Sequence, residues 1–146
     1  MKKIKLLTFL FIAIVAGFIL SSNVFAFEEG EYIGSVVDTY NNENNVATAK
    51  ITINSKGKIE SVYLDTTYQG TTKKELKDDY NMKKFNSKAA GEWYEQVEKL
   101  EDAIVEHNGV GFLELNEDGK TDAVSGCTIK IDALVRAVED ALNKAK

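Results

Sequence analysis

The chain has 146 residues, of which 44% are apolar and 28% charged, a composition that fits one globular domain. Its 18 basic and 23 acidic residues give a formal net charge of −5, and Lys2, Lys3 and Lys5 leave 15 basic residues for the chain from Phe27 onward. Because this excess of acidic residues repels the phosphate backbone of nucleic acids, the composition argues against DNA or RNA as a partner. One cysteine excludes an internal disulfide, and a single histidine beside it argues against a dedicated transition-metal site.

The first 26 residues have the three parts of a secretory signal peptide: a basic start, an uncharged run over 6–20 and small or moderate residues up to Ala26. The alternative is an uncleaved N-terminal membrane anchor, because the 22 residues between Lys5 and Glu28 carry no charge. That length would just cross a hydrocarbon core of about 30 Å. Either way we expect residues 27–146 to be extracytoplasmic, secreted or anchored at the outer face of the cytoplasmic membrane.

Three strands are predicted next. Tyr32, Ile33, Val36 and Val37 mark the first, over 31–40, and the asparagine-rich residues 41–45 predict a turn. Residues 46–53 alternate between apolar and polar side chains, which is typical of a half-buried strand. Residues 54–57 predict a hairpin turn, and 58–66 the returning strand. The three strands form an antiparallel meander.

The hydrophobic period then changes from two to that of a helix. A short helix is expected within 73–82, and Ser87 is a candidate N-cap for a longer helix that ends near His107, at the Asn108-Gly109 pair. A short strand over 110–115 and a helix over 129–144 complete the chain. The apolar stripes of the two long helices are Ala90, Trp93, Val97, Leu100 and Ile104, then Ile131, Leu134, Val135, Val138 and Leu142. The order predicts an α+β fold, an antiparallel β-meander packed against helices.

The segment 121–128, just before the last helix, carries the chemistry. Ser125 and Thr128 supply hydroxyls, Gly126 permits a left-handed backbone, and Thr128 stands where a helix N-cap would be. Free N–H groups of residues 129–131 at a helix start would form a site for phosphate or another anion. The alternative is that Ser125 and Thr128 only cap the helix.

Residues 122–128, Asp-Ala-Val-Ser-Gly-Cys-Thr, resemble the flavinylation motif of the FMN-binding domain family. These extracytoplasmic domains are related to subunits of the Rnf and Na⁺-translocating quinone reductase complexes and to surface electron-transfer flavoproteins. The family pattern is Asp, two variable residues, Ser or Thr, Gly, Ala, then Thr or Ser. This chain departs from it at Cys127, which is small and apolar enough for an alanine site. The glycine-rich opening of the first strand at 30–34 and the turn at 57–59 fit the family as well.

By this resemblance, Thr128 is the acceptor of covalent FMN, joined through a phosphoester by a flavin transferase that uses FAD and Mg²⁺. The phosphate would lie against the start of the C-terminal helix. Asp122 would hydrogen-bond loop N–H groups or help hold the transferase's metal, while Ser125 and Gly126 would shape the loop. Tyr63, Tyr68 and Tyr80 are candidates to stack on the isoalloxazine, whereas Trp93 is expected in the core.

The resemblance implies an electron carrier without catalysis of its own. It would relay electrons from a membrane quinone-linked oxidoreductase to another flavoprotein, a reductase or an external acceptor. A first alternative is a secreted binding or surface module that holds FMN or another anionic ligand noncovalently, or not at all. A second is a thiol enzyme with Cys127 as nucleophile and His107 as base, since a helix N-terminus lowers a thiol pKa.

Overall fold

A computed structural model describes residues 27–40 and 42–146. The predicted signal peptide or anchor over 1–26 lies outside these residues. Among the helices that the structure describes, none has the length and apolar character needed to cross a membrane.

The sheet is antiparallel, with its strands in chain order: β1 (Gly30–Tyr40), β2 (Glu43–Ile53), β3 (Ile59–Tyr68) and β4 (Thr71–Thr72). The predicted meander is therefore confirmed. The turn expected over 41–45 is shorter, because Asn44 and Asn45 already pair with Thr39 and Asp38. The Asn44 side chain accepts a hydrogen bond from Thr39 Oγ1 at 2.9 Å, so the side chains that suggested a turn extend the hairpin instead.

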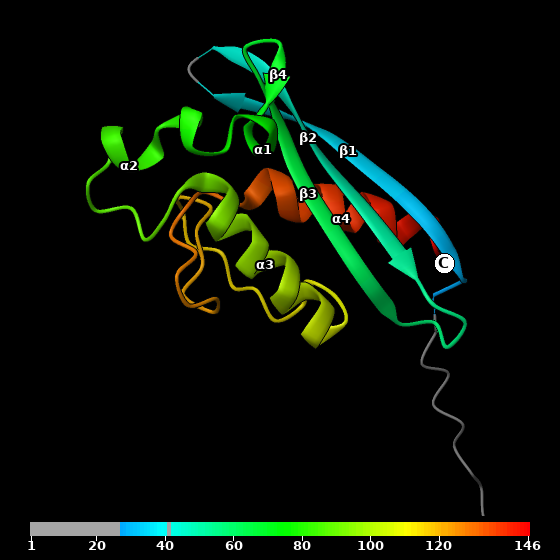
Figure 1. The fold of residues 1–146 in the computed structure, drawn as a ribbon. Helices are drawn as coiled ribbons and strands as arrows, with labels where there is room; N and C mark the ends of the chain where they lie inside the picture. The colour runs from blue at the N-terminus through cyan, green and yellow to red at the C-terminus, as the bar shows by residue number, and fades with distance from the viewer. Residues whose placement is uncertain (1–26, 41) are drawn as a thin grey trace, which may run out of the picture.

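Five helical segments follow the sheet. They are α1 (Lys73–Leu76), the 3₁₀ helix η1 (Lys77–Tyr80), α2 (Met82–Phe85), α3 (Trp93–His107) and α4 (Asp132–Lys144). The two long helices, α3 and α4, pack against the same face of the sheet, and the segment from α1 to α2 lies near the start of α3 (Figure 1). The fold is α+β, with a C-terminal helix after the predicted attachment loop.

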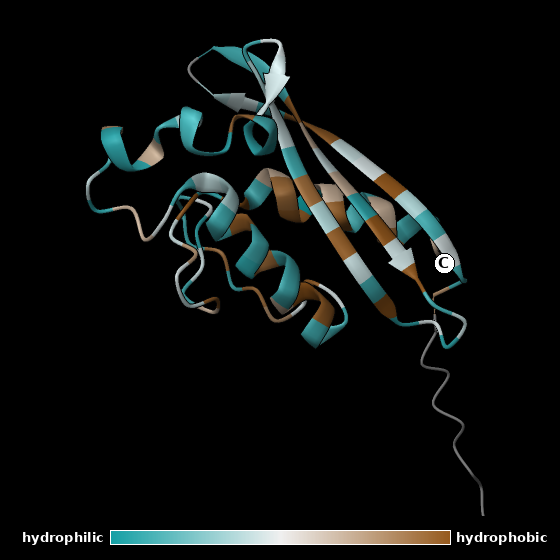
Figure 2. Cartoon of the chain, viewed as in Figure 1, coloured by the Kyte–Doolittle hydropathy of each residue, from teal (hydrophilic) through white to brown (hydrophobic). Residues whose placement is uncertain are grey.

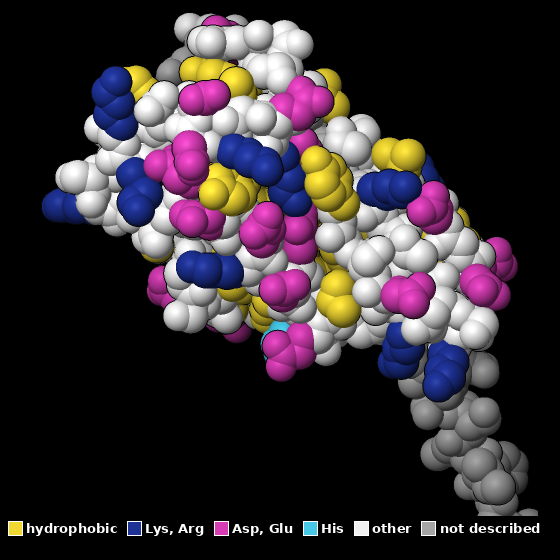
Figure 3. All heavy atoms as spheres, viewed as in Figure 1, with side chains coloured by type: hydrophobic (Ala, Val, Ile, Leu, Met, Phe, Trp, Pro, Cys, Tyr) yellow, Lys and Arg dark blue, Asp and Glu magenta, His cyan; other side chains and the backbone are white. Residues whose placement is uncertain are grey.

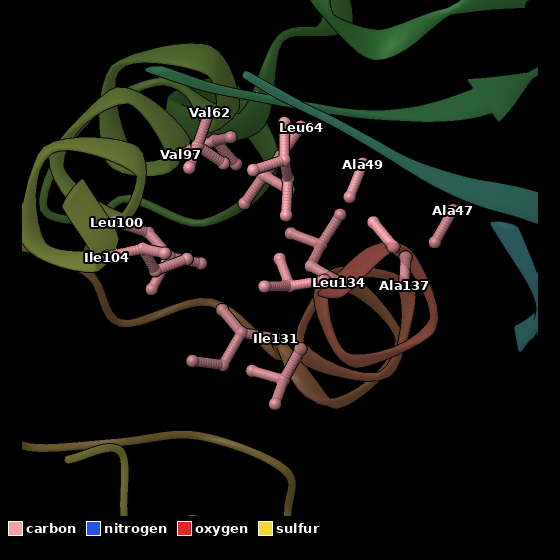
Figure 4. Close-up of a cluster of buried hydrophobic side chains, with 14 of the residues drawn as sticks. Ala47, Ala49, Val62, Leu64, Val97, Leu100, Ile104, Ile131, Leu134 and Ala137 are labelled. Atoms are coloured by element: carbon pink, nitrogen blue, oxygen red, sulfur yellow. The ribbon is translucent and has the colours of Figure 1, made fainter. Parts of the chain in front are cut away.

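The core lies between the sheet and the two long helices. Hydrophobic residues alternate along β2 and β3 (Figure 2), and on β2 the predicted inward residues Ala47, Ala49, Ile51 and Ile53 are all at most 1% exposed. In the close-up, Val62 and Leu64 face Val97 and Leu100 of α3, while α4 supplies Leu134 and Ala137 (Figure 4). The predicted stripe of α4 is fully buried.

Helix α3 begins at Trp93 rather than after Ser87, because the local bonds that start it involve Glu92. The Glu92 N–H donates to the Glu95 carboxylate at 2.7 Å, and the Glu92 carboxylate accepts the Met82 N–H at 2.9 Å. Ala90, predicted on the stripe, is exposed before the helix. The predicted end is confirmed: Asn108 adopts a left-handed φ of 54° directly after His107.

The strand predicted over 110–115 is absent from the described structure, and the segment is an irregular loop. Val110, Phe112 and Leu113 are half-buried against the core, and the Leu113 N–H closes a turn on the Val110 carbonyl at 3.0 Å. Phe112 also stacks on His107, with 4.0 Å between the ring centroids. The apolar side chains of the segment 110–115 therefore pack against the core, although its backbone does not pair with a strand.

Side chains of the two long helices, and of Asn108 directly after α3, bind backbone groups of β1 and β3. On β1, Asp140 accepts the Ser35 N–H at 3.1 Å and Lys144 Nζ donates to the Ile33 carbonyl at 2.8 Å. On β3, Glu101 accepts the Leu64 N–H and Asn108 Oδ1 accepts the Ile59 N–H at 2.8 Å. Each long helix thus packs on the sheet, and side chains from it or directly after it also bind backbone groups of one strand.

The exposed side of α3 is acidic. Glu95, Glu98, Asp102 and Glu106 are exposed there, and acidic side chains gather over this part of the molecule (Figure 3). Part of the net negative charge of the chain therefore lies on the exposed side of α3.

Candidate functional site

A cavity of about 480 Å³ lies where the starts of α3 and α4 meet the far end of β1. Its lining comes from β1, the α1 to α2 segment, the first turns of α3 and α4, and the loop that precedes α4. This volume is within the roughly 300–1,000 Å³ usual for sites that hold small organic ligands. Thr128 is among the residues that line the cavity.

Thr128 is exposed, and its backbone N–H and its hydroxyl group both donate to the same buried side chain. The Thr128 N–H donates to Gln96 Oε1 at 2.8 Å, and Thr128 Oγ1 donates to the same oxygen at 3.1 Å. Gln96 is 0% exposed. Its Nε2 donates to the Gly91 carbonyl at 2.8 Å and to Met82 Sδ at 3.6 Å, so the amide is fixed from both ends.

The loop before Thr128 contains a tight turn that needs its glycine. The Cys127 N–H donates to the Val124 carbonyl at 3.1 Å, and Gly126 has a φ of +76°. A β-carbon on Gly126 would lie 2.6 Å from Lys99 Nζ, so the lysine covers the turn. Glycine is favoured here by its left-handed backbone conformation, since the flexible lysine could move aside.

Cys127 is 2% exposed, and burial raises the pKa of its thiol. A raised pKa disfavours the thiolate that a nucleophile needs. Lys99 of α3 covers the turn next to Cys127. His107 is at the other end of α3, eight residues beyond Lys99, which is roughly 12 Å along the helix axis. The structure therefore gives no support to the thiol-enzyme alternative, and Cys127 fills a small apolar space.

The remaining residues of the predicted motif are on the surface. Asp122 and Ser125 are exposed, and neither side chain takes part in a hydrogen bond among the described residues. The loop N–H of Ala123 is accepted instead by Thr121 Oγ1 at 3.1 Å. The predicted hydrogen bonds in which loop N–H groups donate to Asp122 are thus not formed among the described residues, and its carboxylate is accessible to solvent.

The helix start predicted at Ile129 is wrong by three residues. The Ile131 N–H donates to the Gly119 carbonyl at 2.7 Å, and the first helical bond runs from the Val135 N–H to the Ile131 carbonyl at 2.9 Å. Thr128 is therefore not the N-cap. The first-turn N–H groups belong to residues 132–134, which lack intrahelical partners as at any helix start. These three residues also line the cavity, so the helix start still faces the space beside Thr128.

Three aromatic side chains line the cavity, those of Tyr40, Tyr80 and Trp93, and Tyr40 is exposed. Trp93 is 3% exposed and serves both the core and the cavity wall, and Tyr80 is half-buried. Lys73 Nζ lies 5.2 Å from the centroid of the Tyr80 ring and from that of the Trp93 ring, and burial lowers the pKa of Lys73. Burial also raises the pKa of Tyr80 to about 12, so its hydroxyl stays protonated at neutral pH.

The other two tyrosines proposed for stacking do not line this cavity. Tyr68 packs edge-on against Tyr80, with 5.1 Å between centroids, and so supports a ring of the cavity wall. Tyr63 lies in a separate, shallow hollow beside Lys74, whose Nζ is 4.0 Å from its ring centroid.

The charges around the cavity are balanced. Lys73, Lys120 and Lys130 face it, as do Asp38, Asp118 and Asp132. Asp132 is paired with Lys130 at 3.4 Å and with Arg136 at 3.7 Å. Among residues 27–40 and 42–146, no group of three His, Cys, Asp or Glu side chains is arranged to hold a metal ion.

Comparison with protein families gives one match. The model of the FMN-binding domain matches residues 44–143, which is more than half of the chain and runs from β2 through most of α4. The chain belongs to the FMN-binding domain family. Comparisons with curated proteins and with solved structures gave no match.

The cavity suits the ligand of the FMN-binding domain family. Half-buried Tyr80 and exposed Tyr40 offer aromatic side chains for a flat heteroaromatic group, while buried Trp93 and half-buried Met82 add an apolar, polarisable wall. Lys120, Lys130 and the first turn of α4 offer cations and N–H donors for a phosphate. The residues present therefore fit both parts of FMN.

Gln96 and Lys73 are two site residues that were not predicted from the sequence, and Met82, Lys120 and Lys130 of the cavity lining were not predicted either. Gln96 is three residues after Trp93 and four before Leu100, so a polar side chain on the buried stripe of α3 could have drawn attention to it. Lys73 belongs to a charged run that is typical of a solvated surface, and only the fold places it between two rings.

Proposed function

We propose that this chain is an extracytoplasmic electron-carrier domain that bears FMN covalently attached to Thr128 through a phosphoester. The observation that carries the proposal is the place of the Thr128 hydroxyl: it belongs to an exposed residue, yet it lines a cavity whose walls include Trp93 and Tyr80. A flavin tethered at this oxygen would have the cavity within reach.

Attachment needs a flavin transferase with FAD and Mg²⁺. A bond forms between Thr128 Oγ1 and the phosphorus of the FMN half of FAD, and the pyrophosphate bond breaks. AMP leaves with the bridging oxygen, and the hydroxyl proton passes to a base of the transferase. Asp122, the first residue of the motif, is accessible and would help hold the transferase's metal during this step.

The isoalloxazine supplies the redox chemistry when bound, and the protein supplies attachment and electrostatics. Ser125 and Gly126 shape the loop that presents Thr128. Lys73 holds an ammonium group at the aromatic wall, where it favours negative charge on a neighbouring ring system. Because a phosphoester prevents loss of the cofactor outside the cell, the domain would work as a fixed relay. Its partners would be a membrane quinone-linked oxidoreductase or another flavoprotein.

The test is co-expression of residues 27–146, behind an export signal, with a flavin transferase. We expect the intact mass to rise by one FMN residue and the denatured, dialysed protein to stay yellow and fluorescent. Thr128→Ala should abolish the adduct, and Thr128→Ser should retain it. An unmodified wild-type protein, or an adduct that persists in Thr128→Ala, would refute covalent attachment at this residue.

The second candidate is a surface module that binds FMN noncovalently. The Trp93 and Tyr80 walls favour it independently of Thr128, since ring stacking needs no covalent bond. Titration of the transferase-free protein with FMN, followed by flavin fluorescence, separates the two: saturable binding that persists in Thr128→Ala, with no adduct from any transferase, would support the module.

A further inference from the structure

We propose that Gln96 is the positioning residue for flavin attachment: it directs the proton of the Thr128 hydroxyl into the protein and leaves the oxygen lone pairs toward the cavity. This inference rests on the proposed function, because it concerns the acceptor residue of that reaction. It adds a residue from α3, 32 positions away from Thr128, to the attachment machinery.

The direction of the hydrogen bond follows from its neighbour. A backbone N–H can only donate, so the Gln96 atom that lies 2.8 Å from the Thr128 nitrogen has to be the amide oxygen. The same oxygen lies 3.1 Å from Thr128 Oγ1, and an amide oxygen can only accept. The threonine hydroxyl is therefore the donor, and its proton points toward Gln96.

The remaining contacts hold this arrangement in place. The amide nitrogen of Gln96 is occupied by the Gly91 carbonyl and by Met82 Sδ, so rotation of the amide would leave buried groups unpaired. Gln96 is completely buried, whereas Thr128 is exposed. A rigid buried group thus sets the orientation of an exposed nucleophile.

The consequence concerns the attachment step. As the bond between Oγ1 and phosphorus forms and the pyrophosphate bond of FAD breaks, a lone pair of Oγ1 has to face the phosphorus. Because the proton of Thr128 Oγ1 is held toward Gln96, the lone pairs of this oxygen point outward. The hydroxyl therefore does not have to rotate before it reacts. Gln96 itself takes no proton, because an amide is not a base at neutral pH, and the proton passes to the transferase.

The experiment measures transfer with purified flavin transferase, FAD, Mg²⁺ and residues 27–146 as the acceptor protein, by intact mass against time. Gln96→Met keeps the length of the side chain and removes both hydrogen-bonding groups. Gln96→Glu keeps an oxygen acceptor for Thr128. Ile104→Val, on the same helix but away from Thr128, is the control for a modest loss of core stability.

We expect Gln96→Met to lower kcat on the order of 10- to 100-fold, the loss typical of a misplaced reacting group, with the KM for the acceptor protein within twofold. KM should hold because Gln96 is buried and no transferase can touch it. Gln96→Glu should recover most of kcat, and Ile104→Val should match the wild type. Wild-type kcat in Gln96→Met, a loss confined to KM, or an equal loss in Gln96→Glu would overturn the proposal.

A measurement without flavin checks the contact itself. Amide hydrogen exchange at Thr128 should be slow in the wild type and in Gln96→Glu and much faster in Gln96→Met. Equal exchange rates in all three would overturn the proposal even if Gln96→Met transferred poorly. If the wild type formed no adduct, the proposed function would be refuted. The exchange rates would still test the hydrogen bond between Gln96 and Thr128.

Discussion

The Asp140 carboxylate on α4 accepts a hydrogen bond from the backbone N–H of Ser35 on β1 at 3.1 Å. The same carboxylate pairs with Lys144 at 2.8 Å, and Lys144 Nζ also donates to the Ile33 carbonyl. One carboxylate and one ammonium group therefore attach the last helix to the first strand. The bond to Lys144 and then the bond from Ser35 hold the pKa of Asp140 below its usual range.

Stability should depend on pH through Asp140. Because the folded pKa is lowered, the contribution of Asp140 is present above its unfolded value near 4 and is lost as the pH falls through the folded value. In urea unfolding followed by circular dichroism, Asp140→Asn should be less stable than the wild type at neutral pH. The difference should shrink under acid, and a constant difference would contradict this role.

Gly34 is where β1 and α4 approach most closely. A β-carbon there would lie 1.9 Å from the Ala137 carbonyl oxygen and 2.5 Å from the Ala141 nitrogen, and both are backbone atoms that cannot move alone. We expect Gly34→Ala to lower the free energy of unfolding by about 1–3 kcal/mol or more. Gly111→Ala is the matched control, since nothing lies within 4 Å of its β-carbon, and it should change stability by less than about 0.5 kcal/mol.

Lys73 should raise the reduction potential of the attached flavin. An ammonium group at a partly buried site is worth about 1–2 kcal/mol to a neighbouring negative charge. Lys73→Met should therefore lower the midpoint potential by about 20–40 mV for a two-electron couple, measured by spectroelectrochemistry. The difference from the wild type should vanish at high pH, where Lys73 loses its proton. Lys56→Met, in the hairpin turn, should leave the potential unchanged.

Cys127 should be dispensable. Because its thiol is buried and its pKa is raised, iodoacetamide should label it slowly in the folded protein and quickly in urea. Cys127→Ala should support flavin attachment at the wild-type rate, with a stability loss of about 1 kcal/mol or less from the missing sulfur. Rapid labelling of the folded protein, with loss of a measurable activity, would restore the thiol-enzyme interpretation.

Periodicity predicted the parts of this fold in which one face is buried. The alternation along 46–53 and the stripe of the C-terminal helix are confirmed, and so is the α3 stripe apart from Ala90, because burial on one face constrains side-chain type at every turn. The prediction of a strand over 110–115 was wrong for a related reason. A short apolar run shows that a segment is buried, but pairing with a neighbour decides whether it becomes a strand.

Helix starts were harder to predict than helix ends. The end at His107 carries a local signature in Asn108 and Gly109. The starts depend on distant groups: Ile131 is held by Gly119, and Met82 binds the Glu92 carboxylate in front of α3. For the same reason the motif pointed to Thr128 but not to Gln96, whose contact with Thr128 spans 32 positions and exists only after folding.

The side chains bound to the backbone of β1 and β3 also limit how this domain meets other proteins. Strand addition, in which a peptide extends a sheet by main-chain pairing, needs a row of free N–H and C=O groups. Here carboxylate, amide and ammonium side chains already bind some of these groups on β1 and β3. Under the proposed function, a redox partner would therefore be met mainly through side-chain surfaces, and the same contacts disfavour strand pairing between copies of the chain.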